Sequence, residues 1–164
     1  MKYDTIIAID PDVHKSGVSY LEVSTRKLEV SNMTFPQLLD YLQFFRRECQ
    51  IVKQQKVVVV VEAGWLNKVS NYHTQASKAG QRIAKNVGSN HETGRKIVEM
   101  AKHYGLEVVE HAPLCKCWRG KDGKITHDEL AQFTGLKGST NQDSRDSAIL
   151  AWTFANLPIK LKVE

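Results

Sequence analysis

The sequence has no long hydrophobic run, which argues against a membrane-spanning protein. Its longest continuous aliphatic stretch, Val57–Val61, is far shorter than the roughly 20 apolar residues that a membrane-spanning helix needs. Met1–Asp4 lacks the form of a signal peptide. With 164 residues, 41% hydrophobic and 25% charged, the chain has the composition of a globular protein with its own core. We therefore expect one domain, residues 1–164, in a cytoplasmic protein without a membrane partner.

Cysteine is also scarce, and the three that occur form a poor disulfide framework. Cys115 and Cys117 are separated by a single residue, and the total is odd. A zinc site built from His111, Cys49, Cys115 and Cys117 is an alternative, although zinc motifs usually place two or more residues between their cysteines. The simpler interpretation is reduced thiols, with the C-x-C pair in a loop.

Acidic residues are missing from one long stretch, between Glu62 and Glu92. The formal net charge is +5. The acid-free stretch contains Lys68, Lys78, Arg82 and Lys85, together with His73 and His91. A second basic stretch contains Lys116, Arg119, Lys121 and Lys124, against Asp122 alone. Segregated positive charge suits binding to a phosphate backbone. Either stretch taken singly could also be a solvated surface.

Hydrophobic periodicity predicts five strands and several helices. The predicted strands are Thr5–Asp10, Gly17–Val23, Lys27–Met33, Val57–Glu62 and Leu106–Glu110. Predicted helices run from Thr34 to about Cys49, from the capping box at Ser89 to Gly105, from the capping box at Thr126 to Gly135, and from about Asp143 to Leu157. A three-strand meander followed by two strand–helix crossovers predicts a mixed α/β sheet with helices on both faces.

Carboxylates stand at the ends of separate predicted elements. Asp10 ends the first strand, and Glu62 ends the valine strand. Asp143 and Asp146 are three residues apart in the first turn of the last helix, so they share one face. If the first and fourth strands are parallel neighbours, Asp10 and Glu62 lie side by side at the carboxyl edge, where α/β sheets place their sites.

Carboxylates gathered in this way repel one another unless cations neutralise them. Mg²⁺ prefers oxygen ligands, and Mn²⁺ substitutes for it. Two such ions can clamp both the attacking water and the leaving oxygen of a phosphodiester. Each acid alone has an ordinary explanation, as a turn former or as a partner of the helix dipole. Their combination with a basic surface predicts a nuclease.

Four segments resemble the RuvC-type Holliday junction resolvases. Thr5–Gly17 (TIIAIDPDVHKSG) is similar to the family's opening strand, which ends I-D-P-G before a turn and T-G. Val57–Glu62 resembles its strand ending in glutamate, and Leu106–Pro113 (LEVVEHAP) resembles the strand before its basic loop. Gln142–Trp152 (QDSRDSAILAW) resembles its D-x-x-D-A helix. The matches occur in order and cover nearly the whole chain.

The resemblance implies an RNase H-like fold, with a mixed five-stranded sheet flanked by helices on both faces. It implies a homodimer that resolves four-way DNA junctions by paired symmetric nicks, with two Mg²⁺ ions in each active site. By resemblance Asp10, Glu62, Asp143 and Asp146 fall on the metal-binding acids, and Trp65 falls on an aromatic that wedges against bases. Lys116 falls on a catalytic lysine. The expected DNA-binding residues are Trp65, Lys68, Lys78, Arg82, Lys85, Arg119, Lys121 and Lys124.

The chain also departs from the family pattern. Asp12 stands where the family usually has glycine, and Ser16 stands in place of threonine. The segment between Glu62 and Gly88 is longer than usual, which suggests a version from a phage or mobile element.

Three other functions remain open. One is an RNase H-like nuclease acting on RNA or RNA–DNA hybrids, and another is a non-catalytic protein that binds branched DNA. The third is a phosphotransferase of the actin and hexokinase type, although those chains are much longer and no second phosphate loop is evident.

Overall fold

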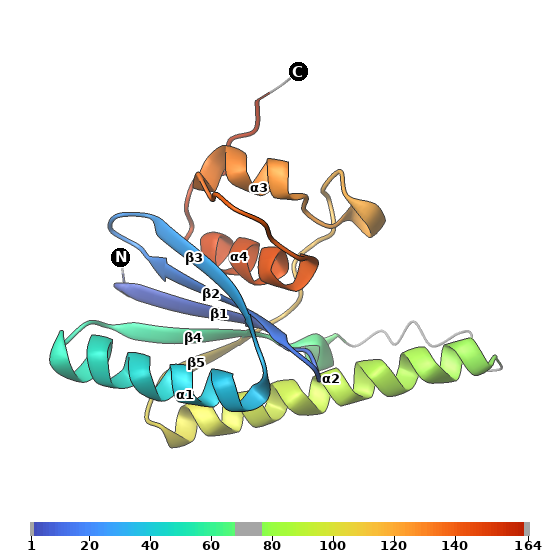
Figure 1. The fold of residues 1–164 in the computed structure, drawn as a ribbon, viewed down its shortest axis with the longest axis horizontal. Helices are drawn as coiled ribbons and strands as arrows, with labels where there is room; N and C mark the ends of the chain where they lie inside the picture. The colour runs from blue at the N-terminus through green and yellow to red at the C-terminus, as the bar shows by residue number, and fades with distance from the viewer. Residues whose placement is uncertain (1, 68–76, 163–164) are drawn as a thin grey trace.

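A five-stranded mixed sheet forms the centre of the computed structural model, which describes residues 2–67 and 77–162. Its strands are β1 (Thr5–Asp10), β2 (Ser16–Glu22), β3 (Lys27–Met33), β4 (Val57–Glu62) and β5 (Glu107–His111). The spatial order is β3-β2-β1-β4-β5, with β2 antiparallel to both neighbours and β1, β4 and β5 mutually parallel (Figure 1). This arrangement confirms the predicted sheet.

Helices cover both faces of the sheet, as expected for the RNase H-like class. The longer helices are α1 (Phe35–Phe45), α2 (Lys78–His103), α3 (His127–Thr134) and α4 (Gln142–Phe154). The π-helical segment η1 (Arg46–Val52) continues α1, and η2 (Gly64–Leu66) and η3 (Lys121–Gly123) are short 3-10 turns. In Figure 1, α1 and α2 lie on one side of the sheet, and α4 lies on the other with α3 beyond it. No helix in the described ranges is long and apolar enough to cross a membrane.

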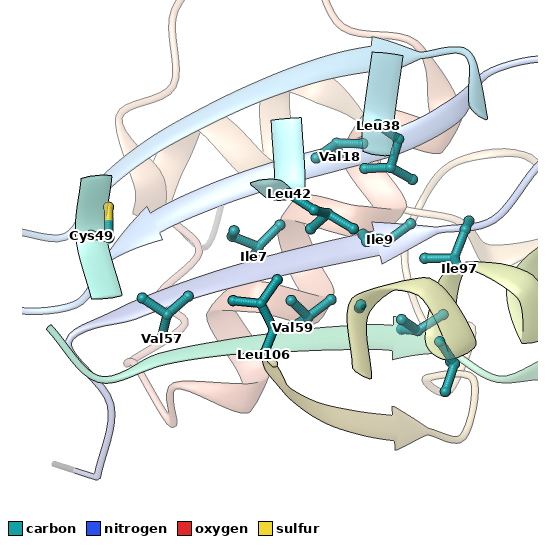
Figure 2. Packing of buried hydrophobic residues seen from close by; sticks show 13 residues of the cluster. Ile7, Ile9, Val18, Leu38, Leu42, Cys49, Val57, Val59, Ile97 and Leu106 are labelled. Carbon is teal, nitrogen blue, oxygen red and sulfur yellow. The ribbon is translucent and has the colours of Figure 1, made fainter. Parts of the chain in front are cut away.

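Side chains on the two faces of β1 pack into two separate hydrophobic cores. Ile7 and Ile9 pack on the α1 and α2 side, against residues such as Leu42 (Figure 2). Ile6 and Ala8 pack on the α4 side. The valine run of β4 is buried throughout, because a central parallel strand is covered on both faces. Strands β1 and β4 are therefore held firmly from both sides, and so are the residues at their ends.

The start of α2 differs from the prediction. We expected a capping box at Ser89, but the helix begins at Lys78, where the side chain of Ser77 accepts a hydrogen bond from the backbone N–H of Gly80 at 3.0 Å. Gly80 and Gly88 lie inside the helix, since an isolated glycine costs only about 1 kcal/mol and does not end a helix by itself. The Ser89 prediction is therefore wrong. The first half of α2 projects beyond the sheet (Figure 1).

Candidate active site

Asp10 and Glu62 end two neighbouring parallel strands. In the register of β1 and β4, Ile9 lies opposite Val61, so the next residue of each strand is an acid at the same edge of the sheet. This confirms the side-by-side placement expected from the sequence. On the other side of β1, Asp10 pairs with Gly17 of β2.

The first turn of α4 is docked onto this edge through a glycine. A Cβ atom on Gly17 would lie 2.0 Å from the carbonyl oxygen of Asp143, so only glycine allows the helix to approach so closely. Behind this contact the hydroxyls of Ser19 and Ser147 lie 2.6 Å apart in a buried hydrogen bond. The side chain of Asn141 caps the helix by accepting a hydrogen bond from the Ser144 N–H at 2.9 Å, as predicted. The close docking brings the acids of α4 to the sheet edge.

The four carboxylates act on one another electrostatically. Burial raises the pKa of Asp10 well above the ordinary range of an aspartate, and the charges of Glu62, Asp146 and Asp143 raise it further. Burial also raises the pKa of Glu62, with the charge of Asp146 as the next cause. Burial raises the pKa of Asp143 too, followed by the charge of Asp12. A cluster in which carboxylates resist ionisation is one that a cation would stabilise.

Lys124 supplies compensating positive charge within this cluster. Its Nζ donates a hydrogen bond to Asp146 Oδ2 at 2.7 Å. Burial would lower the pKa of Lys124, but the hydrogen bond and charge of Asp146, with the charges of Asp10 and Asp143, raise it overall.

The donor set of the cluster suits a metal ion, although no metal-binding geometry is formed as it stands. Within residues 2–67 and 77–162, no three His, Cys, Asp or Glu side chains converge closely enough to hold a metal. The donors are all carboxylate oxygens, which hard divalent cations such as Mg²⁺ prefer. A bound cation would compete with the Lys124 ammonium for Asp146.

A cleft of about 640 Å³ opens over the acids. Asp10, Glu62 and Asp146 line its floor together with Lys124, and the exposed Lys116 stands at its side. After burial and Asp146, the positive charges of Lys124 and Lys116 are the next influences on the pKa of Glu62, and both lower it. The cleft therefore combines carboxylates with cationic side chains.

Trp65 lines the same cleft, and its side chain is half-buried. Its Nε1 donates a hydrogen bond to Glu110 Oε2 at 3.1 Å, and the Arg95 guanidinium lies 5.4 Å from the ring centroid. A Cβ on Gly94 of α2 would lie 2.5 Å from the indole, so the ring packs closely on that helix. The next residue, Leu66, is 47% exposed.

The other predicted DNA-binding residues occupy two surfaces. Lys78, Arg82 and Lys85 are exposed on the projecting half of α2. Arg119 and Lys121 are exposed in the loop between β5 and α3. Lys68 and His73 lie outside the described residues.

The zinc alternative fails because its residues are far apart. Cys49 is buried in the core beside Val57 at the start of β4 (Figure 2), whereas His111 ends the parallel strand β5 at the opposite edge. Cys115 and Cys117 are exposed free thiols. This agrees with the simpler interpretation of reduced cysteines.

Three further side chains make contacts around the site, and the sequence had pointed to two of them: Asp12 as a departure from the family pattern, and Glu129 as part of the Thr126 capping box. Gln142 donates a hydrogen bond to Asp146, and Glu129 binds the loop that carries the cationic residues. Asp12 accepts hydrogen bonds from the backbone of the β1–β2 turn and from Asn90 of α2. The pairing of Gln142 with Asp146 was not predicted, although glutamine and aspartate four residues apart on a helix commonly pair.

No protein-family model matches the chain, and no curated protein is significantly similar to it in sequence. Among solved structures, the chain is similar to Thermus thermophilus RuvC in complex with a Holliday junction substrate, with 16% identity, a TM-score of 0.49 and 92% of each chain covered. It is also similar to a second T. thermophilus RuvC structure, with 16% identity, a TM-score of 0.47, and coverage of 92% of this chain and 93% of that one. At this level the likeness concerns the fold, and what the site can do follows from its own residues.

Proposed function

We propose that this protein is a Mg²⁺-dependent endonuclease that hydrolyses phosphodiester bonds in branched DNA. The observation that carries the proposal is the gathering of Asp10, Glu62 and Asp146 in one cleft that is also lined by Lys116 and Lys124. Asp143, in the same turn of α4, does not line the cleft, but its charge also raises the pKa of Asp10. Acids from three elements that are brought together despite burial and mutual repulsion indicate a functional site. A set of donors made only of carboxylates suits the binding of a divalent cation.

Two Mg²⁺ ions bound by these acids, or Mn²⁺ in their place, would activate water and stabilise the leaving oxygen of a phosphodiester. The chain's own part is to hold the ligands and the substrate. The buried strands β1 and β4 fix Asp10 and Glu62, and the docked α4 fixes the other two acids. Lys116 and Lys124 lie where a positive charge would stabilise charge developing on the phosphate.

DNA binding is proposed to use the cationic surfaces around the cleft. Lys78, Arg82 and Lys85 on α2, and Arg119 and Lys121 in the loop, are exposed and able to contact phosphates. Lys68 belongs to the same proposal. Trp65, at the wall of the cleft, is proposed to meet an unstacked base.

The four-way junction is proposed as substrate because of the resemblance of four sequence motifs to RuvC-type resolvases. Symmetric nicks in opposite strands need two active sites related by a two-fold axis, so the proposal includes a homodimer. A non-catalytic binder gains nothing from carboxylates gathered in one cleft, which favours an enzyme.

The proposal is tested with a synthetic mobile four-way junction, labelled on each strand in turn and incubated with Mg²⁺. We expect nicks at symmetric positions in two opposing strands, no nicks in linear duplex, and no activity with EDTA. Preferential cutting of a matched RNA–DNA hybrid would support the alternative RNase H-like nuclease. Junction binding without cleavage in Mg²⁺ or Mn²⁺ would support a non-catalytic binder.

A further inference from the structure

The amide of Gln142 lies against the carboxylate of Asp146. Gln142 is the first residue of α4, and Asp146 follows one turn later on the same face. Gln142 Nε2 donates a hydrogen bond of 2.7 Å to Asp146 Oδ1 and a longer one of 3.4 Å to the carbonyl oxygen of Ile125. Asp146 is therefore held from within its own helix as well as by Lys124.

Arg145 fixes which way this amide points. Its Nη2 donates to Gln142 Oε1 at 2.9 Å, its Nη1 donates to the carbonyl of Thr140 at 2.8 Å, and its Nε donates to the carbonyl of Ile125 at 3.1 Å. Arginine has donors only, so it can pair with the amide oxygen but not with the amide nitrogen. A flipped Gln142 would face donor to donor at Arg145 and oxygen to oxygen at Asp146. The hydrogen bonds from Arg145 to Gln142 and from Gln142 to Asp146 therefore allow one favourable orientation of the Gln142 amide.

The two oxygens of Asp146 consequently have different partners. Oδ1 accepts from a neutral amide, which orients the carboxylate without cancelling its charge. Oδ2 accepts from the Lys124 ammonium, whose charge also acts on Asp10 and Glu62. Oδ2 is thus the oxygen that faces Lys124, which lines the same cleft as Asp10 and Glu62.

We propose that Gln142, oriented by Arg145, is a positioning residue that presents Asp146 Oδ2 to the divalent cation. This inference rests on the proposed function, because it concerns the same cation site. Partners of this kind typically contribute 10–100-fold to metal affinity by holding a ligand in place. Gln142 need not touch the substrate to have this effect.

The test is Mn²⁺ binding by the full chain, measured by electron paramagnetic resonance and calorimetry without DNA. Gln142→Leu keeps the bulk of the side chain but removes the donor, and we expect Mn²⁺ affinity to fall by about 10–100-fold. Gln142→Asn keeps an amide that is too short to bridge, and the same loss is expected. Gln132→Leu is the matched control on the exposed face of α3 and should bind Mn²⁺ like the parent.

Junction cleavage over a range of Mn²⁺ concentrations gives an independent readout. A positioning role predicts that high Mn²⁺ restores the cleavage rate of Gln142→Leu, whereas structural damage to α4 would not be restored. Parent-like Mn²⁺ affinity in both Gln142 variants would overturn the inference while leaving the proposed function intact. A parent protein that binds no Mn²⁺ would overturn both.

Discussion

Partial burial separates Asp10 and Glu62 from acids that merely end a strand. An exposed aspartate after a strand commonly forms a turn at no electrostatic cost. Here burial comes first among the causes that raise the pKa of both side chains, and neighbouring carboxylates add to it. Acids with a perturbed pKa tend to mark functional sites. The burial of Asp10 and Glu62 is therefore stronger evidence for a site than their positions at strand ends.

The lysines of the cleft and those of α2 should have different kinetic effects. Lys116 and Lys124 line the cleft beside the acids, so Lys116→Ala or Lys124→Ala should slow single-turnover cleavage at saturating protein. Lys78 and Arg82 are exposed on α2 and do not line the cleft. Their alanine variants should mainly weaken junction binding and lower the salt slope by about one per contact. The assignment is reversed if Lys78→Ala stops saturated cleavage and Lys116→Ala does not.

Trp65 is predicted to act through its flat face, beyond its packing on α2. Because the ring is half-buried against Gly94, Trp65→Ala would remove packing and stacking together, and its effect could not be assigned to either. Trp65→Phe keeps an aromatic face, whereas Trp65→Leu keeps only apolar bulk. Stacking is worth about 1–3 kcal/mol per base, so we expect Leu but not Phe to reduce junction cleavage by about tenfold or more.

A 2-aminopurine beside the branch point reports the same effect directly. Its fluorescence should show less unstacking with Trp65→Leu than with Trp65→Phe or the parent. Equal fluorescence and equal cleavage for all three proteins would show that Trp65 is only a packing residue.

At the scale of elements, the docking of α4 on β2 depends on Gly17. Gly17→Ala would place a methyl group against the Asp143 backbone, and overpacking of this kind costs about 1–3 kcal/mol. The helix must shift to relieve the contact, which displaces two of the four acids. We expect a lower free energy of unfolding and a large loss of cleavage.

Gly88 offers a matched control for that substitution. A Cβ there meets nothing within 4 Å, and alanine is favoured over glycine in a helix by about 1 kcal/mol. Gly88→Ala should be neutral or stabilising and should keep its activity. Parent-like cleavage by Gly17→Ala would show that the position of α4 does not matter for the site.

Glu129 fastens the loop between β5 and α3. Its carboxylate accepts hydrogen bonds from the backbone N–H groups of Arg119 and Thr126, each at 3.0 Å. Burial would raise the pKa of Glu129, but these hydrogen bonds outweigh burial and lower it from the ordinary value of 4.5. The carboxylate therefore stabilises the fold above that pH, and the stabilisation is lost as pH falls through the lowered pKa. Hydrogen bonds to a charged group contribute about 1.5–3 kcal/mol.

The comparison of Glu129→Gln with the parent protein tests this role. We expect the variant to have a lower free energy of unfolding at neutral pH, with the difference narrowing as the pH is lowered below 4.5. Urea titrations at several pH values measure it. A difference that is constant with pH would mean that the charge of Glu129 contributes nothing.

For the molecule as a whole, the elements with strong local signals were the ones predictable from sequence. The strand Thr5–Asp10 and the valine strand were placed correctly, because continuous apolar residues bounded by polar ones leave little choice. The Thr126 cap was also correct. The start of α2 was missed because Ser89 offered a good capping box inside a helix whose true cap, Ser77, lies twelve residues earlier. Homodimer formation stays a prediction.

In the candidate site too, the placement that follows from strand order was predictable, whereas contacts between residues distant in sequence were not. Adjacent strands in parallel register were enough to bring Asp10 beside Glu62. The hydrogen bond between Asp12 and Asn90 joins residues 78 positions apart, and the Lys124–Asp146 ion pair joins residues 22 apart. Contacts of that kind depend on how the layers pack, which no local pattern specifies.

The most direct test of the central claim compares junction binding and cleavage by the parent with those of Asp143→Asn and Asp146→Asn. Each asparagine keeps the size of the side chain and removes one cation-binding charge. We predict that cleavage in Mg²⁺ is abolished in both variants, while junction affinity, measured in gel shifts without metal, stays within a few-fold of the parent because phosphate contacts come from other residues. Full cleavage by either variant would contradict a nuclease site built on these four acids.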